Sequence, residues 1–328
     1  MEPNETWAVG VDLGGTKVEV ARVDSAGRLH QRLKRPTNVK EGPEAVKKEI
    51  VDLARQLQEL AGSPPIGIGI GLAGQIDPHE GVVIFAPNLY WHNVPFQSDL
   101  KRALRLPVAI TNDVRAVAWG EWLHGAGEGC DDLVCLFVGT GIGGGIVSGG
   151  RMLTGCNNTA GELGHITVDL NGPPCTCGQK GCLEASAGGW AIEKIAQEAV
   201  ALDLPAGTLL TQLAGGTPGG ITAKTVAEGV QAGDLLSLRL IERVLQALIA
   251  GCTSIVNAFN PCRLILGGGV IEGLPELVDQ IDRGVRKRAL PAATKSLQVL
   301  RAKLGNDAGV VGAATFAFQT FKDKDRPN

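Results

Sequence analysis

Several features that would indicate particular classes of protein are missing from this sequence. The 328 residues carry 31 Lys and Arg against 34 Asp and Glu, a formal net charge of −3, with no long block of one sign. We therefore expect no extended basic surface for nucleic acid. The longest uncharged apolar stretches, such as residues 66–74, are far shorter than the ~20 residues of a membrane span, so no membrane partner is expected.

The start of the chain shows no targeting segment. Residues 1–6 are polar and acidic, and a strand-like run begins at Trp7, a pattern unlike that of a signal or transit peptide. We therefore expect an unprocessed cytoplasmic protein. In that reducing compartment the 8 cysteines are expected to be metal ligands or reduced core residues rather than a disulfide framework.

Glycine, in contrast, is abundant, with 46 of 328 residues, roughly twice the average share. No glycine period of three runs through the chain, which excludes collagen, and the 44% hydrophobic content excludes low-complexity disorder. Glycines also alternate with isoleucines in residues 66–71. The backbone is therefore expected to turn sharply or approach other groups closely at several places.

Hydrophobic periodicity predicts two successive α/β lobes, and the length agrees with two domains. The expected elements of the first lobe are strands at 7–13, 17–23 and about 28–35, a helix from Pro43, strands at 66–72 and 107–111, and a helix at 113–124. Those of the second are strands at 133–138 and 145–148, a helical region from about 188, a helix at 235–258, a strand at 264–266, a helix at 275–289, a strand near 297–301 and a helix at 309–321. Two such units predict a ligand cleft as the natural site.

A first glycine motif, DLGGTK, occupies residues 12–17 between two predicted strands. Paired glycines expose backbone N–H groups, Thr16 and Lys17 can meet an anion, and Asp12 can hold a metal directly or through water. An ordinary hairpin turn with a solvated Asp and Lys explains the same residues equally well.

A second motif, GTGIGG at 139–144, matches the G-x-G-x-x-G pattern, with Glu162 downstream. A dinucleotide fingerprint must open a helix, whereas residues 145–150 are glycine-rich and strand-like, so a phosphate-cradling hairpin turn is favoured. A G-x-x-x-x-G-K-[ST] motif does not occur, which excludes a P-loop. The third motif, Gly267-Gly268-Gly269, follows a strand and suits either a nucleoside packed on bare backbone or a plain strand-to-helix turn.

The cysteines are concentrated in CTCGQKGC at 175–182. Cys175, Cys177, Cys182 and the preceding His165 complete the ligand set of a closed structural zinc site, although His165 could instead be a lone histidine. A nucleic-acid zinc module is disfavoured, because Lys180 is the only basic side chain in the loop and no aromatic is interleaved.

Taken together, these motifs resemble the ROK (repressor, open reading frame, kinase) family. The residues that carry the resemblance are DLGGTK at 12–17, TND at 111–113, GTGIGG at 139–144, GELGH at 161–165, the run from Cys175 to Glu184 and LILGGG at 264–269. It covers Trp7 to about Phe321. Only six residues precede Trp7, where the repressor members carry an added DNA-binding region, so the chain is most similar to the sugar-kinase branch, and within it to the bacterial glucokinases.

The resemblance implies an α/β fold of two actin-like, ribonuclease H-like lobes with a ligand cleft between them and a zinc-bearing loop in the second. The implied domains are 1–121, with a C-terminal helix at about 306–328 packing back on it, and 122–305, with the zinc loop and nucleotide-binding turns. It also implies a homo-oligomer, with dimer and tetramer both open.

The implied activity is ATP-dependent phosphorylation of a hexose 6-hydroxyl, most simply glucose to glucose 6-phosphate, with Mg²⁺ accompanying ATP. Asp113 would be the general base; a helix N-cap, shared with Asn112, is its alternative role. Asp12 would orient Mg²⁺. The implied phosphate and nucleoside contacts are Gly14, Gly15, Thr16, Lys17, Gly139, Thr140, Gly141, Gly143, Gly267, Gly268 and Gly269.

On the sugar side, Asn88, Asn112, Asp113, Glu162, His165 and Glu184 match the family's contacts to the hydroxyls. His165 would serve as both zinc ligand and sugar neighbour, because one ring nitrogen on the metal leaves the other as a donor. Without the resemblance, Glu162 and Glu184 would be taken as exposed loop carboxylates. Alternative activities are an N-acetylmannosamine or N-acetylglucosamine kinase, a fructokinase, and a sugar-sensing regulatory protein without catalysis.

Overall fold

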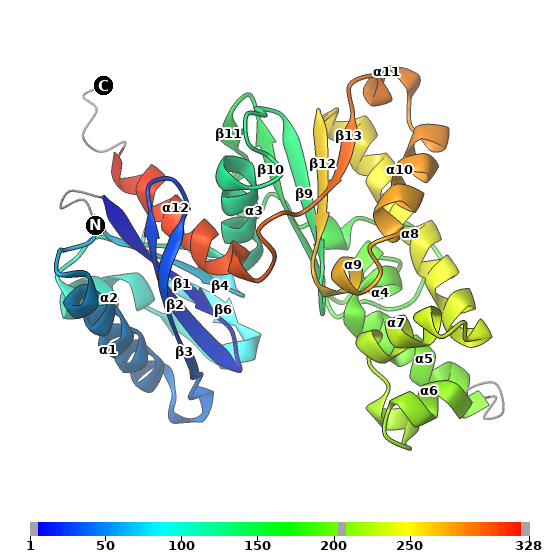
Figure 1. Ribbon diagram of the computed structural model, residues 1–328, viewed down its shortest axis with the longest axis horizontal. Coiled ribbons are helices and arrows are strands. Elements are labelled where there is room, and N and C mark those ends of the chain that lie inside the picture. The colour runs from blue at the N-terminus through cyan, green and yellow to red at the C-terminus, as the bar shows by residue number, and fades with distance from the viewer. Residues whose placement is uncertain (1–5, 203–207, 323–328) are drawn as a thin grey trace. The chain divides into compact units, whose positions relative to one another are not determined.

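The computed structural model describes residues 6–202 and 208–322, and in this part of the chain the predicted alternation of strands and helices is confirmed (Figure 1). The polar start at 1–5 and the end of the expected C-terminal helix at 323–328 lie outside the described residues.

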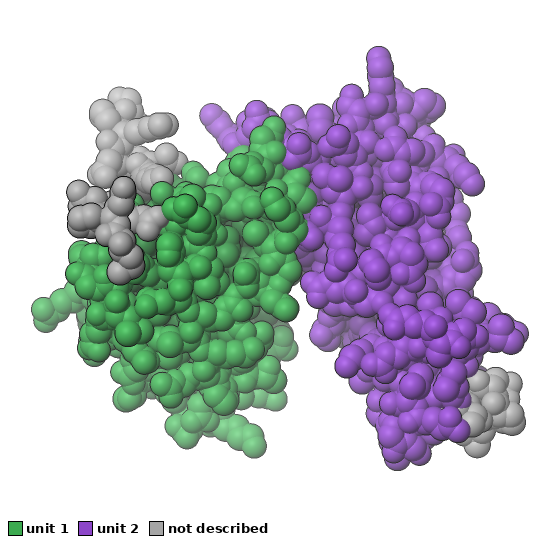
Figure 2. Space-filling model, in the orientation of Figure 1, with its two compact units in different colours: residues 1–129, 152–160, 303–328 green, residues 130–151, 161–302 purple. Residues whose placement is uncertain are grey.

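Two compact units make up the described part of the chain, and Figure 2 shows them in different colours. Unit 1 comprises residues 1–129, 152–160 and 303–328, and unit 2 comprises residues 130–151 and 161–302, as far as these ranges are described. The domain limits at 121 and 305 that the resemblance implies remain a proposal beside these units.

Unit 1 is built on a mixed five-stranded sheet of order β3-β2-β1-β4-β8. Its strands are β1 (Trp7–Leu13), β2 (Lys17–Asp24), β3 (Leu29–Pro36), β4 (Ile68–Leu72) and β8 (Val108–Asn112). Strands β1 to β3 form an antiparallel meander, whereas β1, β4 and β8 run parallel. The carboxyl ends of three parallel strands therefore meet at one edge.

Helices cover both faces of this sheet. Odd-numbered β1 residues such as Val9 and Val11 pack with α1 (Pro43–Ala61) and α2 (Phe96–Leu104), and the even-numbered Ala8 packs with α12 (Ala308–Lys322). Helix α12 also packs along α3 (Asp113–His124). A Cβ at Gly10 would lie 1.9 Å from the Val310 carbonyl oxygen, and one at Gly69 would lie 1.8 Å from that of Ala313. Part of the glycine surplus is thus explained by close helix-to-sheet packing rather than by ligands.

Unit 2 repeats this strand order with a mixed sheet β11-β10-β9-β12-β13, which agrees with two related lobes. The strands are β9 (Leu133–Val138), β10 (Ile142–Ser148), β11 (Arg151–Met152), β12 (Arg263–Gly267) and β13 (Gln298–Arg301); the limit between the units falls within β11, after Arg151. The helices are α4 (Leu183–Ala187), α5 (Gly189–Leu202), α6 (Thr208–Leu213), α7 (Ala223–Gln231), α8 (Leu235–Phe259), α9 (Gly269–Gly273), α10 (Leu277–Arg288) and α11 (Pro291–Thr294). Its core is centred on α8 and on the β9 and β12 side chains that face the helices.

Two local features differ from the sequence prediction. Strand β10 begins at Ile142, not at 145, because Gly143 and Gly144 pair with Phe137 and Leu136 of β9; the glycine turn is therefore shorter than expected. Unit 1 also contains a three-stranded sheet that the periodicity did not predict, formed by β5 (Gln75–Ile76), β6 (Val83–Ala86) and β7 (Trp91–Val94). The helical turn η2 (Pro87–Leu89) follows β6 directly.

Candidate functional site

The parallel strands of unit 1 end in register. Leu13 of β1 lies beside Leu72 of β4, which lies beside Asn112 of β8. Ligands of open α/β sheets bind outside the carboxyl ends of such strands. The DLGGTK turn and the Asn112-Asp113 pair both occupy this edge, so the sequence motifs of unit 1 converge there.

The charge of Asp113 acts on Asp12 at this edge. Burial, and next the negative charge of Asp113, raise the pKa of Asp12 to about 6, while Lys17 opposes the rise. Two carboxylates in a partly buried site repel each other, and a cation between them would relieve the repulsion. The donor chemistry at Asp12 therefore suits Mg²⁺, which prefers carboxylate oxygens and arrives with nucleotide phosphates.

Asn112 caps helix α3, as one of the sequence interpretations expected. Its Oδ1 accepts hydrogen bonds from the backbone N–H groups of Val114 at 3.0 Å and Arg115 at 3.2 Å, so its side-chain amide N–H groups are what it can offer a ligand. A carboxylate oxygen of Asp113 accepts a hydrogen bond from the Val114 N–H at 2.9 Å. Both side chains are half-buried, and their hydrogen bonds tie them to the first turn of α3.

The DLGGTK turn is braced by its neighbours. The Thr37 hydroxyl donates to the Gly14 carbonyl at 2.7 Å, and the Thr37 N–H donates to the Thr16 carbonyl at 3.0 Å. Thr16 and Lys17 are exposed, so both side chains are accessible to an anion.

Glu19, which sequence reasoning missed, organises the cations at this turn. It is 4% exposed and lies opposite Asp12 across β1 and β2. Its carboxylate pairs with Lys17 at 2.8 Å and Lys34 at 2.9 Å, and its hydrogen bond raises the pKa of Lys17. Alternation along β2 could have placed Glu19 on the face shared with Asp12, but periodicity alone gives no reason for a buried acid there.

Asn88 lies directly against the glycine turn. A Cβ at Gly15 would lie 2.5 Å from the Asn88 carbonyl oxygen and 3.2 Å from its Cβ. Likewise, a Cβ at Gly74, just beyond β4, would lie 2.8 Å from the Phe85 carbonyl oxygen. The segment from Phe85 to Asn88 therefore crosses the carboxyl ends of β1 and β4.

Two buried charged residues of α3, the helix that starts at Asp113, were not singled out from the sequence. Arg115 is 6% exposed, and its guanidinium donates to the Asn158 and Ala160 carbonyl oxygens at 3.0 and 3.1 Å and also bonds the Asn158 side chain. Glu121 is 0% exposed and accepts from the backbone N–H groups of Lys303 and Leu304. The helix that starts with Asp113 is thus anchored to two distant segments of unit 1.

In unit 2, the GTGIGG motif joins the antiparallel strands β9 and β10, so the rejection of a helix-opening dinucleotide motif is confirmed. Glu184 holds the motif, because its Oε2 accepts from the Ile142 N–H at 2.8 Å and its Oε1 from the Trp190 indole N–H at 3.2 Å. The Gly189 and Trp190 N–H groups donate to the carbonyls of Gly139 and Thr140, each at 2.9 Å. The half-buried Glu184 therefore stabilises this turn through its hydrogen bonds.

The predicted zinc ligands come together in unit 2. The ligand atoms of His165, Cys175, Cys177 and Cys182 all lie within 4.8 Å of one another. Cys175 Sγ is 3.7 Å from His165 Nδ1, and Cys177 Sγ is 3.7 Å from Cys182 Sγ. Tetrahedral zinc with bonds of ~2.3 Å to sulfur requires sulfurs roughly 3.8 Å apart, so the cluster is consistent with structural zinc.

The loop around these ligands depends on glycine at two places. Gly178 and Gly181 have φ of +89° and +72°, and a Cβ at Gly181 would lie 1.7 Å from the Asp169 carbonyl oxygen. The Cys175 N–H donates to the Gln179 carbonyl at 2.8 Å, which closes the turn. Burial, followed by the neighbouring thiols, raises the pKa of Cys182 to about 12; a bound metal would have to displace this proton.

The remaining candidates of unit 2 lie near this cluster or on the β12 turn. Glu162 and His165 are exposed at the two ends of a short helical turn, and Nδ1 of His165 faces the thiols, which leaves Nε2 for a ligand. At the GGG motif, a Cβ at Gly268 would lie 2.6 Å from the Val138 carbonyl oxygen, and one at Gly267 would meet the Phe137 ring at 2.8 Å; at Gly269 it would meet nothing within 4 Å. Gly269 is therefore the one glycine of this motif whose backbone is open to a neighbouring group.

No helix in the described part of the chain is long and apolar enough to cross a membrane.

Known proteins resemble this chain over nearly its whole length. A protein from Halalkalibacterium halodurans named glucokinase is 35% identical over 329 residues, covering 99% of both chains. One from Citrobacter koseri named N-acetylmannosamine kinase is 33% identical, covering 94% of this chain and 98% of its own.

Among solved structures, a ROK family glucokinase from Streptomyces griseus in complex with glucose and AMPPNP is 34% identical, with a TM-score of 0.82, and the alignment covers 95% of this chain and 99% of the other. The model of the ROK family matches residues 8–320. The sequence resemblance is thereby confirmed: the chain belongs to the ROK family.

Proposed function

We propose that the protein is an ATP-dependent sugar kinase that transfers the γ-phosphoryl group to the 6-hydroxyl of a hexose, with glucose as the preferred acceptor. The observation that carries this proposal is the convergence of Asp12, the Gly14-Gly15 turn and Asp113 at the carboxyl ends of three parallel strands. This arrangement combines a base, a phosphate-binding turn and a carboxylate suited to Mg²⁺.

In the proposed reaction Asp113 accepts the proton of the sugar 6-hydroxyl as that oxygen attacks the γ-phosphorus and ADP leaves. The bond to Val114 N–H fixes the Asp113 carboxylate, and Asn112 and Asn88 hold other hydroxyls. Magnesium, when bound with ATP near Asp12, neutralises charge on the phosphates. Gly14, Gly15, Thr16 and Lys17 contact phosphate, and Glu19 orients Lys17.

Unit 2 contributes the second set of proposed contacts. Gly139, Thr140, Gly141 and Gly143 form the second phosphate turn, and Gly267, Gly268 and Gly269 face the nucleoside, with Gly269 the most accessible. Glu162, Glu184 and His165 contact sugar hydroxyls. Zinc on His165 Nδ1 would fix the ring so that Nε2 points to the sugar without taking part in the reaction.

A coupled ADP-release assay over glucose, fructose, mannose, N-acetylmannosamine and N-acetylglucosamine tests the proposal. We expect the highest kcat/KM with glucose. Turnover with none of these sugars would refute the kinase, and saturable glucose binding without ATP turnover would favour a sugar-sensing protein instead.

A second candidate is an N-acylhexosamine kinase, favoured by the 33% identity to the C. koseri protein named N-acetylmannosamine kinase. The same assay separates the two, because this candidate requires an N-acetylated sugar to exceed glucose in kcat/KM.

A further inference from the structure

Tyr90 is an exposed aromatic side chain between two buried ones. Tyr90 is 80% exposed, whereas Leu89 and Trp91 are each 1% exposed. Leu89 and Trp91 both belong to the core of unit 1, so the backbone around Tyr90 is held from both sides. The ring is therefore directed outward by the fold rather than by a loose loop.

The backbone at Tyr90 is also in an unfavourable conformation. Tyr90 has φ +58° and ends the helical turn η2 in the left-handed region, with its N–H bonded to the Pro87 carbonyl at 3.2 Å. Of the five described non-glycine residues with positive φ, three are asparagines, which tolerate it, and the others are Tyr90 and Arg105. Glycine or asparagine is usual at such a position. Strain of this kind concentrates at functional sites.

Tyr90 lies close in the chain to the candidate site. It lies two residues after Asn88, whose backbone and Cβ pack on Gly15, and the segment from Phe85 to Asn88 crosses the ends of β1 and β4. The same edge carries Asp12 and Asp113. Two residues span at most about 7 Å of chain, so the exposed Tyr90 starts within about 7 Å of Asn88, close to where a ligand of this edge would bind.

We propose that the Tyr90 ring contacts the apolar face of the sugar acceptor. The C–H groups of a pyranose carry partial positive charge and complement the negative face of an aromatic ring. Hydrogen bonds to the sugar hydroxyls cannot supply this interaction. This inference rests on the proposed function and adds a residue to its sugar site.

The experiment uses the fact that the chain contains one tyrosine. Full-length protein grown with 3-fluorotyrosine gives a single ¹⁹F resonance from Tyr90. Titration with the best acceptor should shift this resonance saturably, with a midpoint matching the binding constant of the sugar. A resonance that does not move at saturating sugar overturns the proposal.

Matched variants provide the second readout. Tyr90→Gly should raise the sugar KM roughly three- to tenfold, the value of one stacking contact, with kcat unchanged, while Tyr90→Phe keeps the wild-type KM. Arg105→Gly removes the same backbone strain at the end of α2, on an exposed residue, and should leave the KM unchanged. An unchanged KM in Tyr90→Gly, or an equal rise in Arg105→Gly, overturns the role of Tyr90.

The two measurements also separate this inference from the proposed function. Turnover with an unmoved ¹⁹F resonance rejects Tyr90 and retains the kinase. A saturable shift without turnover retains Tyr90 as a sugar contact and rejects the kinase.

Discussion

The carbonyl oxygen of Asn88 packs so closely on Gly15 that a methyl group at Gly15 would lie 2.5 Å from it. The loop that carries the proposed sugar contact Asn88 is therefore supported by the turn that carries the proposed phosphate contacts. A side chain added at Gly15 must therefore displace Asn88, although the two residues are far apart in the sequence.

Gly15→Ala should consequently impair both substrates. The new Cβ must displace Asn88, because the Asn88 carbonyl oxygen belongs to the backbone and cannot rotate away as a side chain could. We expect the unfolding free energy to fall by about 1–3 kcal/mol, which is typical of overpacking. The KM should rise for both sugar and ATP. Gly14→Ala is the comparison, since its Cβ would be 3.4 Å from its nearest neighbour, the Lys17 carbonyl oxygen. Urea unfolding and steady-state kinetics give both quantities; equal effects at the two glycines would contradict the packing argument.

Zinc content tests the His165 and cysteine cluster. Wild-type protein should contain about one zinc per chain, and Cys177→Ser should lose most of it, because Cys177 is one of the four clustered ligands. Cys262→Ser is the control, being an exposed cysteine outside the cluster. Elemental analysis after dialysis measures the zinc content of each variant. Zinc retained in Cys177→Ser would remove this thiol from the ligand set.

The same zinc variant tests the link to the sugar. Because His165 is both in the cluster and a proposed sugar contact, we expect Cys177→Ser to weaken sugar binding as well. Normal glucose binding by metal-free, folded protein would show that the metal does not orient His165.

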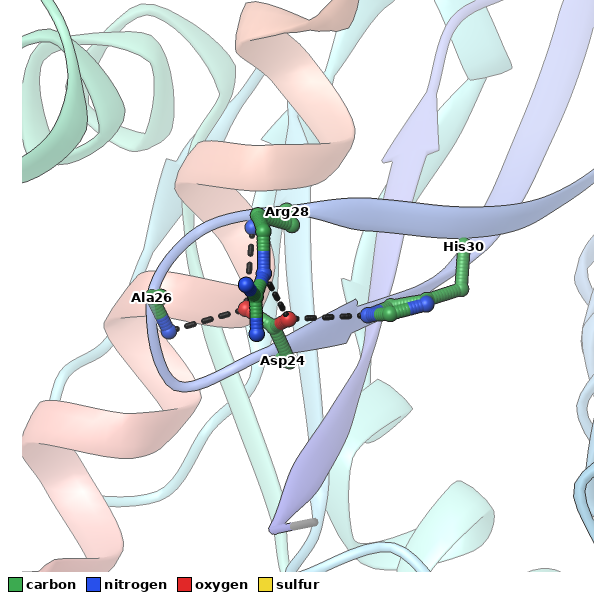
Figure 3. Close-up of polar contacts among 4 residues, drawn as sticks. All are labelled: Asp24, Ala26, Arg28 and His30. Carbon is green, nitrogen blue, oxygen red and sulfur yellow. Dashed lines mark hydrogen bonds and ion pairs between the residues drawn. The ribbon is translucent and has the colours of Figure 1, made fainter. Parts of the chain in front are cut away.

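Asp24 predicts how stability depends on pH. Its side chain is 1% exposed, and its carboxylate contacts Ala26, Arg28 and His30 (Figure 3). It accepts hydrogen bonds from the Ala26 N–H at 2.9 Å, the Arg28 N–H at 3.0 Å and Arg28 Nε at 2.7 Å, and lies 2.8 Å from His30 Nε2. Burial opposes the charge, but the hydrogen bonds from Arg28 and His30 outweigh it and hold the pKa of Asp24 well below its ordinary value.

A carboxylate with a lowered pKa stabilises the folded state above its unfolded pKa of ~3.9, and this contribution is lost as pH falls through the folded pKa. Asp24→Asn should therefore be less stable than wild type by about 2 kcal/mol at pH 7, with a smaller difference at pH 3. Urea midpoints at the two pH values measure it. A difference that is equal or larger at pH 3 would contradict the account.

Much of the fold was predictable because the sequence patterns are local and regular. The apolar strand at 133–138 and the helix at 113–124 have the bounds that were expected, since the apolar run of the strand and the Asn112 cap of the helix are encoded by neighbouring residues. The zinc ligands were also predictable, because three of the four lie within one short loop. The dinucleotide motif at 139–144 could be rejected because residues 145–150, directly after it, have the pattern of a strand and not of a helix.

The contributions that depend on distant packing were not predictable. Strands β6 and β7 are four residues each and expose Phe85 and His92, so they carry little periodicity. Arg115 and Glu121 are ordinary polar helix residues in the sequence, and their burial depends on segments around 158–160 and 303–304. The Gly10 and Gly69 contacts with α12 likewise required the fold.

The central claim is that Asp113 is the base of a hexose kinase, and the kcat of Asp113→Asn with the best acceptor tests it most directly. The substitution keeps an oxygen that can accept the Val114 N–H, so folding and sugar binding should be retained while kcat falls by about a thousandfold, within the range of general-base catalysis. A fall of only about twofold in a variant that binds sugar normally would contradict the account.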